Sequence, residues 1–305
     1  MERREFLKYF AVATLGGTIL FPTDIYAKKR SKKSTKRNKT SKKVEIRTNE
    51  SVFSEIISKA EKNNWKKLNI GEVTATIGKQ FIGYPYEAGT LEVNGENEEI
   101  VVNLTEFDCV TFIENTLALA RIIKKEKHTL DDFAKELTHI RYRGGKISDY
   151  TSRLHYTSDW ITDNTKKGII TDVSQSIGGK PISFNVYYMS ENSDQYPVLR
   201  KVPKMIGEIE VYEEHIRKRT YYYIPNENIS QVQHKFQNGD IFAIATNKPG
   251  LDYSHVGLIT LENGQANLLH ASSKNKKVVL ENDLLKYFSN NQNNIGISVL
   301  RPLEL

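Results

Sequence analysis

The stretch FDCVTFIE, residues 107–114, contains the only cysteine of the 305-residue chain. Apolar residues then recur three or four positions apart, as on one face of a helix, at Val110, Ile113, Leu117 and Ala120. The pattern predicts a helix that runs to about Lys125, and residues 99–104 before it have the composition of a strand or extended segment. Cys109 therefore lies in the first turn of the predicted helix.

The position of Cys109 has chemical consequences. Unpaired N–H groups and the helix dipole at a helix N-terminus favour a thiolate and lower the thiol pKa. Such a thiol is suited to nucleophilic catalysis. A free cysteine also occurs commonly as a small buried apolar residue, so this stretch alone leaves both interpretations open.

The first 27 residues have the pattern of an export signal. Residues 3–8, RREFLK, resemble a twin-arginine motif, an apolar run follows at 10–21, and Ala27 is the expected last residue removed. The run is short for a permanent membrane span, although an uncleaved anchor is the alternative. We expect an exported protein that is periplasmic or associated with the cell envelope. Exported proteins usually pair their cysteines, so a single free thiol calls for a reason such as catalysis.

The positive net charge of +7 comes from the N-terminal part of the chain. Residues 1–43 hold 13 of the 44 Lys and Arg and 3 of the 37 Asp and Glu, which leaves a net charge of −3 for residues 44–305. Residues 28–43 form a basic linker, expected to be disordered, that either contacts anionic membrane or wall polymer or serves as a plain spacer. The slightly acidic domain at 44–305 gives no support for nucleic-acid binding.

The rest of the chain predicts an α+β fold. Helices are expected at 51–63, with Ser51 as N-cap, at 71–82 and from Thr129 onward, and a hairpin at 91–104 around Asn94-Gly95. From residue 168 the chain is rich in strand formers. Strands are expected at 181–187 and 219–225, with a short helix at 212–217 between them, and an antiparallel sheet is expected from residues 241–246, 254–260, 268–272, 276–280 and 296–300.

Two of the seven histidines lie on neighbouring predicted strands. His255 and His270 are joined through Asn263-Gly264, so a hairpin would place both imidazoles side by side, on the face toward the Cys109 helix. A thiol nucleophile needs a base, and the base needs a residue that orients it. Taken singly, each histidine is more often a structural residue.

A second group of polar and aromatic residues, RLHYTSDW, occupies positions 153–160. Arginine binds carboxylates with paired hydrogen bonds, and Tyr and Trp offer flat faces that also carry donors. The stretch is either a substrate-binding surface or the packed start of a helix.

The combination of DC at a helix start with GDIFAI, SHVGLI and LLHASS resembles the NlpC-type superfamily of papain-like cell-wall hydrolases. PYEAGTLE, NLTEFDCVTFIENTLAL and RLHYTSDWI resemble, more closely, its N-acetylmuramoyl-L-alanine-amidase-like branch over roughly residues 50–305. The resemblance implies a papain-like core in which the Cys helix packs on an antiparallel sheet or barrel, with helical and strand insertions between Cys and His. Superfamily members commonly have Ser after the Cys, where this chain has Val110.

The resemblance also implies roles for residues. Cys109 is then the nucleophile, His255 the base, His270 the orienting residue, and Tyr86 a candidate second donor to the oxyanion. The expected substrate is peptidoglycan or a muropeptide, cut between the lactyl group of N-acetylmuramic acid and L-alanine. The candidate substrate-binding residues are Asp108, Arg141 or Arg143, Arg153, His155, Tyr156, Trp160 and Ser254.

No cofactor and no metal are expected, and the protein is expected to act as a monomer. Three alternatives stay open at this point: an endopeptidase that cuts after D-glutamate, a zinc amidase and a non-catalytic wall-binding protein. The chain contains no HExxH motif, which argues against the zinc enzyme.

Overall fold

A computed structural model describes residues 47–93, 95, 97–289 and 292–305. The predicted signal at 1–27, the predicted linker at 28–43 and the first residues of the predicted domain lie outside the described residues. The helices of the described part are α2 Asn49–Lys62, α3 Ile70–Gln80, α4 Cys109–Lys124, α5 Leu130–Arg141, α6 Thr157–Lys166, α7 Tyr188–Glu191, α8 Pro197–Lys201, α9 Lys204–Arg217, α10 Ile229–Val232 and α11 Leu284–Ser289.

One antiparallel sheet organises the C-terminal half of the chain. Its strands are β1 Ile170–Asp172, β2 Lys180–Ile182, β3 Tyr221–Pro225, β4 Ile241–Thr246, β5 Tyr253–Glu262, β6 Gln265–Ser272, β7 Lys277–Glu281 and β8 Asn294–Pro302. They are ordered β2-β3-β8-β4-β5-β6-β7, and β1 pairs with β8 beside β3. The predicted α+β class and the antiparallel sheet are confirmed.

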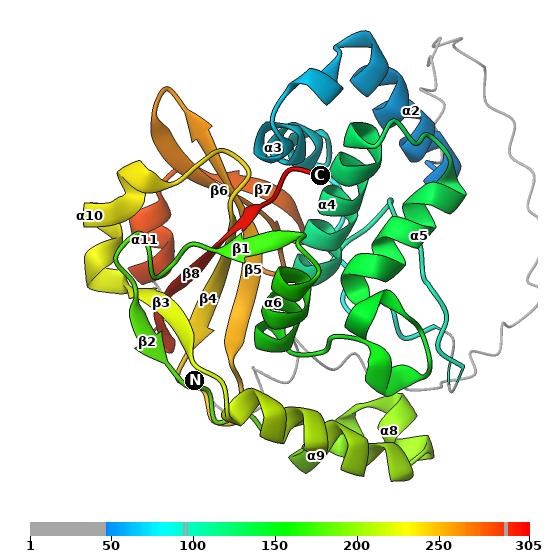
Figure 1. Ribbon diagram of the computed structural model, residues 1–305, viewed down its shortest axis with the longest axis vertical. Helices are drawn as coiled ribbons and strands as arrows, with labels where there is room; N and C mark the ends of the chain where they lie inside the picture. The colour runs from blue at the N-terminus through cyan, green and yellow to red at the C-terminus, as the bar shows by residue number, and fades with distance from the viewer. Residues whose placement is uncertain (1–46, 94, 96, 290–291) are drawn as a thin grey trace, which may run out of the picture.

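Helices cover both faces of this sheet (Figure 1). On one face α3 and α4 pack against the sheet in the larger apolar cluster, which includes Val256, Leu258 and Leu269, and α5 packs on α4. On the other face Phe242, Ile259 and Leu268 pack with residues of α10 and α11. Alternation along each strand produces this division, because successive side chains point to opposite faces.

The helix that begins at Cys109 is the central helix of the larger cluster. Thirteen of its sixteen residues, from Thr111 to Ile123, are buried, so α4 has a partner on nearly every side. Its buried charges are paired, Glu114 with Arg141 and Arg121 with Glu136. This burial fixes the axis of α4 and therefore the position of its first turn.

A short ribbon of main chain connects the sheet to the start of α4. The Gly83 N–H donates to the Val278 carbonyl of β7, and Val278 N–H donates back to Tyr84. Phe107 N–H then donates to the Pro85 carbonyl, and Tyr86 and Phe107 form a parallel bridge. The sheet is thus extended through residues 83–87 to residue 107, directly before Asp108 and Cys109.

Several local predictions need correction. No strand is present among the described residues of 91–104, which form turns and loops, so the predicted hairpin is wrong. Helix α2 is capped by Thr48 rather than by Ser51, because Ser51 occupies the third helical position of a capping box. The predicted strand at 181–187 is reduced to β2, and the predicted helix at 212–217 is the end of the longer α9.

Within the described residues, no helix combines the length and the apolar character needed to cross a bilayer.

Candidate active site

The first turn of α4 is fixed by its N-cap. The Oδ1 atom of Asp108 accepts from the Thr111 N–H at 2.7 Å, and the Thr111 hydroxyl accepts from the Asp108 N–H at 2.9 Å. This reciprocal capping box sets where the helix begins. Cys109 is consequently the first residue of the helix and is only partly buried. The predicted position of the thiol is therefore confirmed.

The two histidines form a hydrogen-bonded pair. His255 on β5 and His270 on β6 are neighbours across the hairpin, and the Nε2 atom of His255 lies 2.8 Å from Nδ1 of His270. The two rings are nearly perpendicular, with centroids 4.8 Å apart. The predicted side-by-side arrangement of the imidazoles is thus present.

Glycine at position 257 makes room for this pair. Leu258 pairs with Leu269 in the register of β5 and β6, so Gly257 lies opposite His270 and on the same face as His255. A Cβ atom at position 257 would lie 2.7 Å from the His270 Cβ and 2.7 Å from the Phe242 ring. The missing side chain therefore allows the two imidazoles to approach diagonally across the hairpin.

The face on which the histidines lie differs from the prediction. Phe242 has ring contacts with both His255 and His270, and it belongs to the apolar cluster on the sheet face opposite α4. The adjacent Val256 instead packs in the cluster that contains α4. The first turn of α4 reaches the site at the end of the sheet, where the ribbon through residue 107 brings it.

The main chain next to His255 contacts the sulfur. The Cys109 sulfur accepts from the N–H of Val256, and from the N–H groups of Cys109 and Val110 at the helix start. The pairing of β5 with β6 begins at Leu258, so β6 makes no ladder pair with Val256. This contact places the thiol beside the strand segment that carries His255.

The protonation of the thiol differs from the expectation. Burial, followed by the Asp108 carboxylate, raises the pKa of the Cys109 thiol to about 12, against the opposing effect of the three N–H groups. Burial and the neighbouring His270 lower the pKa of His255 well below its usual value, and burial lowers the pKa of His270 to about 4. At neutral pH the free protein thus holds a neutral thiol beside two neutral imidazoles.

Two tyrosines lie within reach of the charge on the Cys109 sulfur. Burial raises the pKa of Tyr86, and negative charge on Cys109 raises it further. The effect of Cys109 places the predicted Tyr86 at the site. Sequence reasoning missed the second, Tyr287 on α11, whose pKa is raised by burial and by charge on Cys109. The apolar pair Leu284 and Phe288, four positions apart, could have indicated an amphipathic turn there.

The two arginines predicted to bind substrate are structural in their contacts. Arg141 is 1% exposed, and its Nε donates to the Glu114 carboxylate at 2.7 Å. Arg153 is 6% exposed and donates to both carboxylate oxygens of Glu98 at 2.8 Å and to Glu92. The Arg141 guanidinium also donates to the Val101 carbonyl. Val101, Glu98 and Glu92 all belong to the segment that leads to Cys109, so both arginines hold this segment in place.

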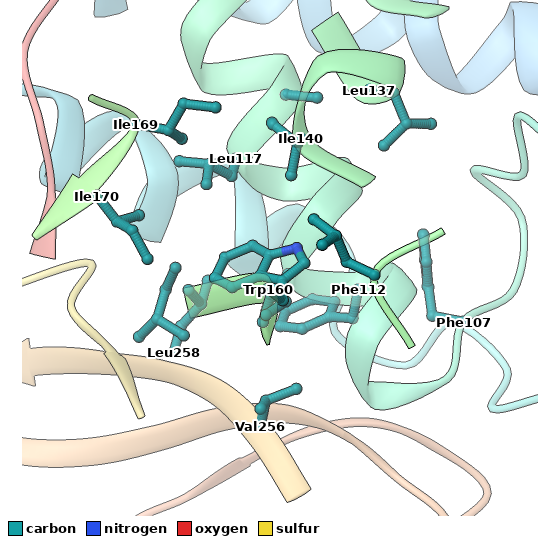
Figure 2. Close-up of a cluster of buried hydrophobic side chains, with 14 of the residues drawn as sticks. Phe107, Phe112, Leu117, Leu137, Ile140, Trp160, Ile169, Ile170, Val256 and Leu258 are labelled. Atoms are coloured by element: carbon teal, nitrogen blue, oxygen red, sulfur yellow. The ribbon is translucent and has the colours of Figure 1, made fainter. Parts of the chain in front are cut away.

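The residues after Arg153 are mostly interior. Trp160 is 2% exposed and packs among Phe112, Leu117 and Leu258 between the helices and the sheet (Figure 2). The Tyr156 hydroxyl is buried and donates to Glu213. The structure thus supports the packed helix start over a substrate-binding surface for these two residues, since tertiary packing buries their apolar faces.

The remaining candidates are partly exposed. The ring of His155 contacts the Tyr150 carbonyl through Nε2 at 2.8 Å and lines a small cavity with Arg143, Tyr212 and others. Arg143 pairs with Asp159 and stacks over the Tyr212 ring. Ser254 lies beside His255, with its hydroxyl 3.2 Å from Asn294 Oδ1. Asp108 is occupied as the helix cap described above.

Among the described residues, no group of three or more His, Cys, Asp or Glu side chains is arranged to hold a metal ion. The fold and the group formed by Cys109, His255 and His270 define a class: α+β proteins with a thiol at a helix N-terminus beside a hydrogen-bonded histidine pair.

Comparison with known proteins narrows this class. A family model described as AmiA-like, N-acetylmuramoyl-L-alanine amidase-like, matches residues 76–297. The chain therefore belongs to this amidase-like family of peptidoglycan hydrolases. No curated protein matches the chain.

Solved structures agree in fold. An N-acetylmuramoyl-L-alanine amidase from Bacteroides uniformis is 35% identical, with a TM-score of 0.73 over 77% of this chain and 99% of that chain. A putative xylanase from Bacteroides fragilis is 39% identical, with a TM-score of 0.70 over 74% of this chain and 99% of that chain. A Legionella pneumophila protein is 23% identical, with a TM-score of 0.62 over 83% of this chain and 95% of that chain, and shares the fold.

Proposed function

We propose that the protein is a cysteine-dependent N-acetylmuramoyl-L-alanine amidase, with Cys109 as nucleophile, His255 as base and His270 as the residue that orients His255. The observation that carries the proposal is the hydrogen-bonded histidine pair beside a thiol whose sulfur accepts from Val256 N–H, next to His255. Membership of the amidase-like family supports the substrate class. We further propose that the core is the papain-like core of the NlpC-type superfamily.

The first half of the reaction forms an acyl-enzyme. Because the free thiol is neutral, His255 removes the Cys109 proton as the sulfur attacks the lactyl carbonyl carbon and a C–S bond forms. The Nε2 atom of His255 is occupied by His270, so its Nδ1 atom takes this proton. His255 then gives the proton to the amine of L-alanine as the C–N bond breaks.

The second half releases the product. His255 removes a proton from water, which attacks the thioester, and the thiol leaves with that proton. The developing oxyanion is stabilised by the Cys109 N–H and by the Tyr86 hydroxyl, and one such donor contributes about 3 kcal/mol. Asp108, Arg143, His155 and Ser254 are the partly exposed candidates for substrate contact.

Mass spectrometry of purified muropeptides tests the proposed function. Incubation with the protein should release stem peptide that begins with L-alanine, and Cys109→Ala should release none. A cut after D-glutamate would instead indicate an endopeptidase, and binding without turnover in both proteins would indicate a wall-binding protein. Sugar release from xylan in a parallel incubation would favour the activity named for the Bacteroides fragilis structure.

Two reagents separate the thiol mechanism from the zinc alternative. Iodoacetamide should abolish amidase activity, and a chelator such as EDTA should leave it unchanged. The opposite pattern would overturn the proposed cysteine mechanism.

We also propose export through the twin-arginine-type signal at residues 1–27, a cell-envelope location, and electrostatic contact of residues 28–43 with anionic membrane or wall polymer. The amidase is proposed to act as a monomer. Fractionation of cells that express the full chain, and sequencing of the mature N-terminus, test the export and the cut after Ala27.

A further inference from the structure

The side of His270 that faces away from His255 is enclosed. His270 is 1% exposed, and its Nε2 atom is buried without a hydrogen-bond partner among the described residues. A buried polar atom without a partner costs free energy, so its surroundings decide whether it is better placed as an N–H or as a lone pair. The choice matters because it fixes the proton on every other nitrogen of the pair.

Aromatic rings surround this imidazole. The Tyr287 ring centroid lies 5.0 Å from that of His270, with an interplanar angle of 62°, and Phe242 lies 6.5 Å away at 73°. Tyr287 is held there by the neighbouring Phe288, which is 1% exposed and packs against Phe242. Phe242 and Phe288 therefore belong to the packed core of this face, and the partly buried Tyr287 packs against that core.

The electrostatics of aromatic rings favour one proton position. The face of such a ring is negative, so it attracts an N–H weakly and repels a lone pair. Burial lowers the pKa of His270 to about 4, against the smaller opposing effect of a hydrogen bond between its ring and the Ala271 main chain. The ring is therefore neutral at pH 7, with one proton to place. A ring face turned toward Nε2 therefore favours that proton on Nε2 over Nδ1.

We propose that Tyr287, together with Phe242, turns its ring face toward Nε2 of His270, holds His270 in the Nε2–H tautomer and thereby makes His255 a base toward Cys109. The Nδ1 atom of His270 is then an acceptor, so it takes the Nε2–H of His255 across the 2.8 Å contact. The lone pair of His255 is left on Nδ1. In the opposite tautomer His270 would donate, and His255 would carry its proton on Nδ1 and could not accept one from the thiol.

Tyr287 acts on this account as a positioning residue, through its ring and not through its hydroxyl. Tyr287→Phe keeps the ring, whereas Tyr287→Met keeps an apolar side chain of similar reach without an aromatic face. Tyr222→Met, a partly buried tyrosine of β3, is the matched control. The proton assignment is independent of any substrate, while its kinetic consequence rests on the proposed amidase function.

The test is NMR of the full chain with ¹⁵N-labelled histidine at pH 7.5, with His255→Gln and His270→Gln used to assign the two rings. His270 should show a protonated Nε2 and an unprotonated Nδ1 in the unmutated protein, in Tyr287→Phe and in the control. Tyr287→Met should show the Nδ1–H form of His270, and its kcat on muropeptides should fall at least about 10-fold.

Three results would overturn the proposal: an Nδ1–H His270 in the unmutated protein, an unchanged tautomer in Tyr287→Met, or a change in Tyr287→Phe as large as in Tyr287→Met. Thermal unfolding of each variant identifies a folding defect, and Tyr287→Leu replaces Tyr287→Met if that variant fails to fold. Failure to cleave muropeptides with the expected tautomer intact would count against the proposed amidase function and not against the role of Tyr287.

Discussion

The Nε2 atom of His255 and the Nδ1 atom of His270 are hydrogen-bonded at 2.8 Å across the β5–β6 hairpin, diagonally past the missing side chain of Gly257. This contact leaves the other ring nitrogen of His255 as the one free for proton transfer. Substitutions on either side of it should therefore have different effects.

Replacing His255 should remove the base, whereas replacing His270 should remove only the residue that orients the His255 ring. We expect His255→Ala to lower kcat by about 10²–10⁴, the usual contribution of general acid–base catalysis. His270→Asn, which keeps an acceptor oxygen, should retain more activity than His270→Leu. Steady-state kinetics on muropeptides, for variants of equal thermal stability, would check this order. A His270→Leu variant as active as His270→Asn would contradict an orienting role.

The pH dependence should reflect a neutral thiol and a neutral base. The lowered pKa of His255 means that kcat/KM is lost only as pH falls well below 6.5, where His255 becomes protonated, and is flat through pH 7–9.

The raised pKa of Cys109, about 12, predicts that its alkylation by iodoacetamide in the free protein increases about tenfold per pH unit up to that range. An alkylation rate already at its plateau at pH 7 would show a preformed thiolate instead.

The buried pair of Arg141 and Glu114 should be a stability determinant. Both side chains are 2% exposed, so Arg141→Leu leaves a buried carboxylate unpaired and should lower the free energy of unfolding by about 3–5 kcal/mol. The double variant Arg141→Leu, Glu114→Leu should recover part of this loss. Denaturant unfolding measures both.

Lys135→Ala is the matched control for that experiment, because its pair with Asp131 is 71% and 73% exposed and should contribute little. An Arg141→Leu protein of normal stability but raised KM would return Arg141 to the substrate-binding residues.

A methyl group at position 257 should disturb the histidine pair directly. Gly257→Ala places a Cβ within 2.7 Å of both the His270 Cβ and the Phe242 ring, so the strands must shift. We expect a loss of kcat of at least about 10-fold and reduced thermal stability, in the range of about 1–3 kcal/mol for overpacking. Gly207→Ala, in helix α9 with open space around it, should be neutral or slightly stabilising. Equal activity of the two variants would contradict the close packing at Gly257.

Local signals in the sequence were sufficient to predict most of the helices and strands around the candidate site. The helical spacing after Cys109 located α4 to within one residue, and the runs of strand-forming residues around His255 and His270 located β5 and β6. These predictions succeeded because helical and strand periodicity, and the register set by Asn263-Gly264, act over short distances along the chain. The turn signal at Asn94-Gly95 failed because the described residues on either side of it form no strand: Glu92 and Glu98 pair with Arg153 instead.

The sequence by itself determined the α+β class, the helix start at the cysteine and the adjacency of the two histidines. Only the tertiary structure decided which sheet face carries the histidines, that Arg141 and Arg153 bind the protein's own carboxylates, and that Tyr287 joins the site from α11. The physical reason is the range of the interactions. Hydrogen-bonded elements form between near neighbours in the chain, whereas burial, ion pairing and thiol pKa depend on side chains that approach from segments tens to more than a hundred residues away in the chain.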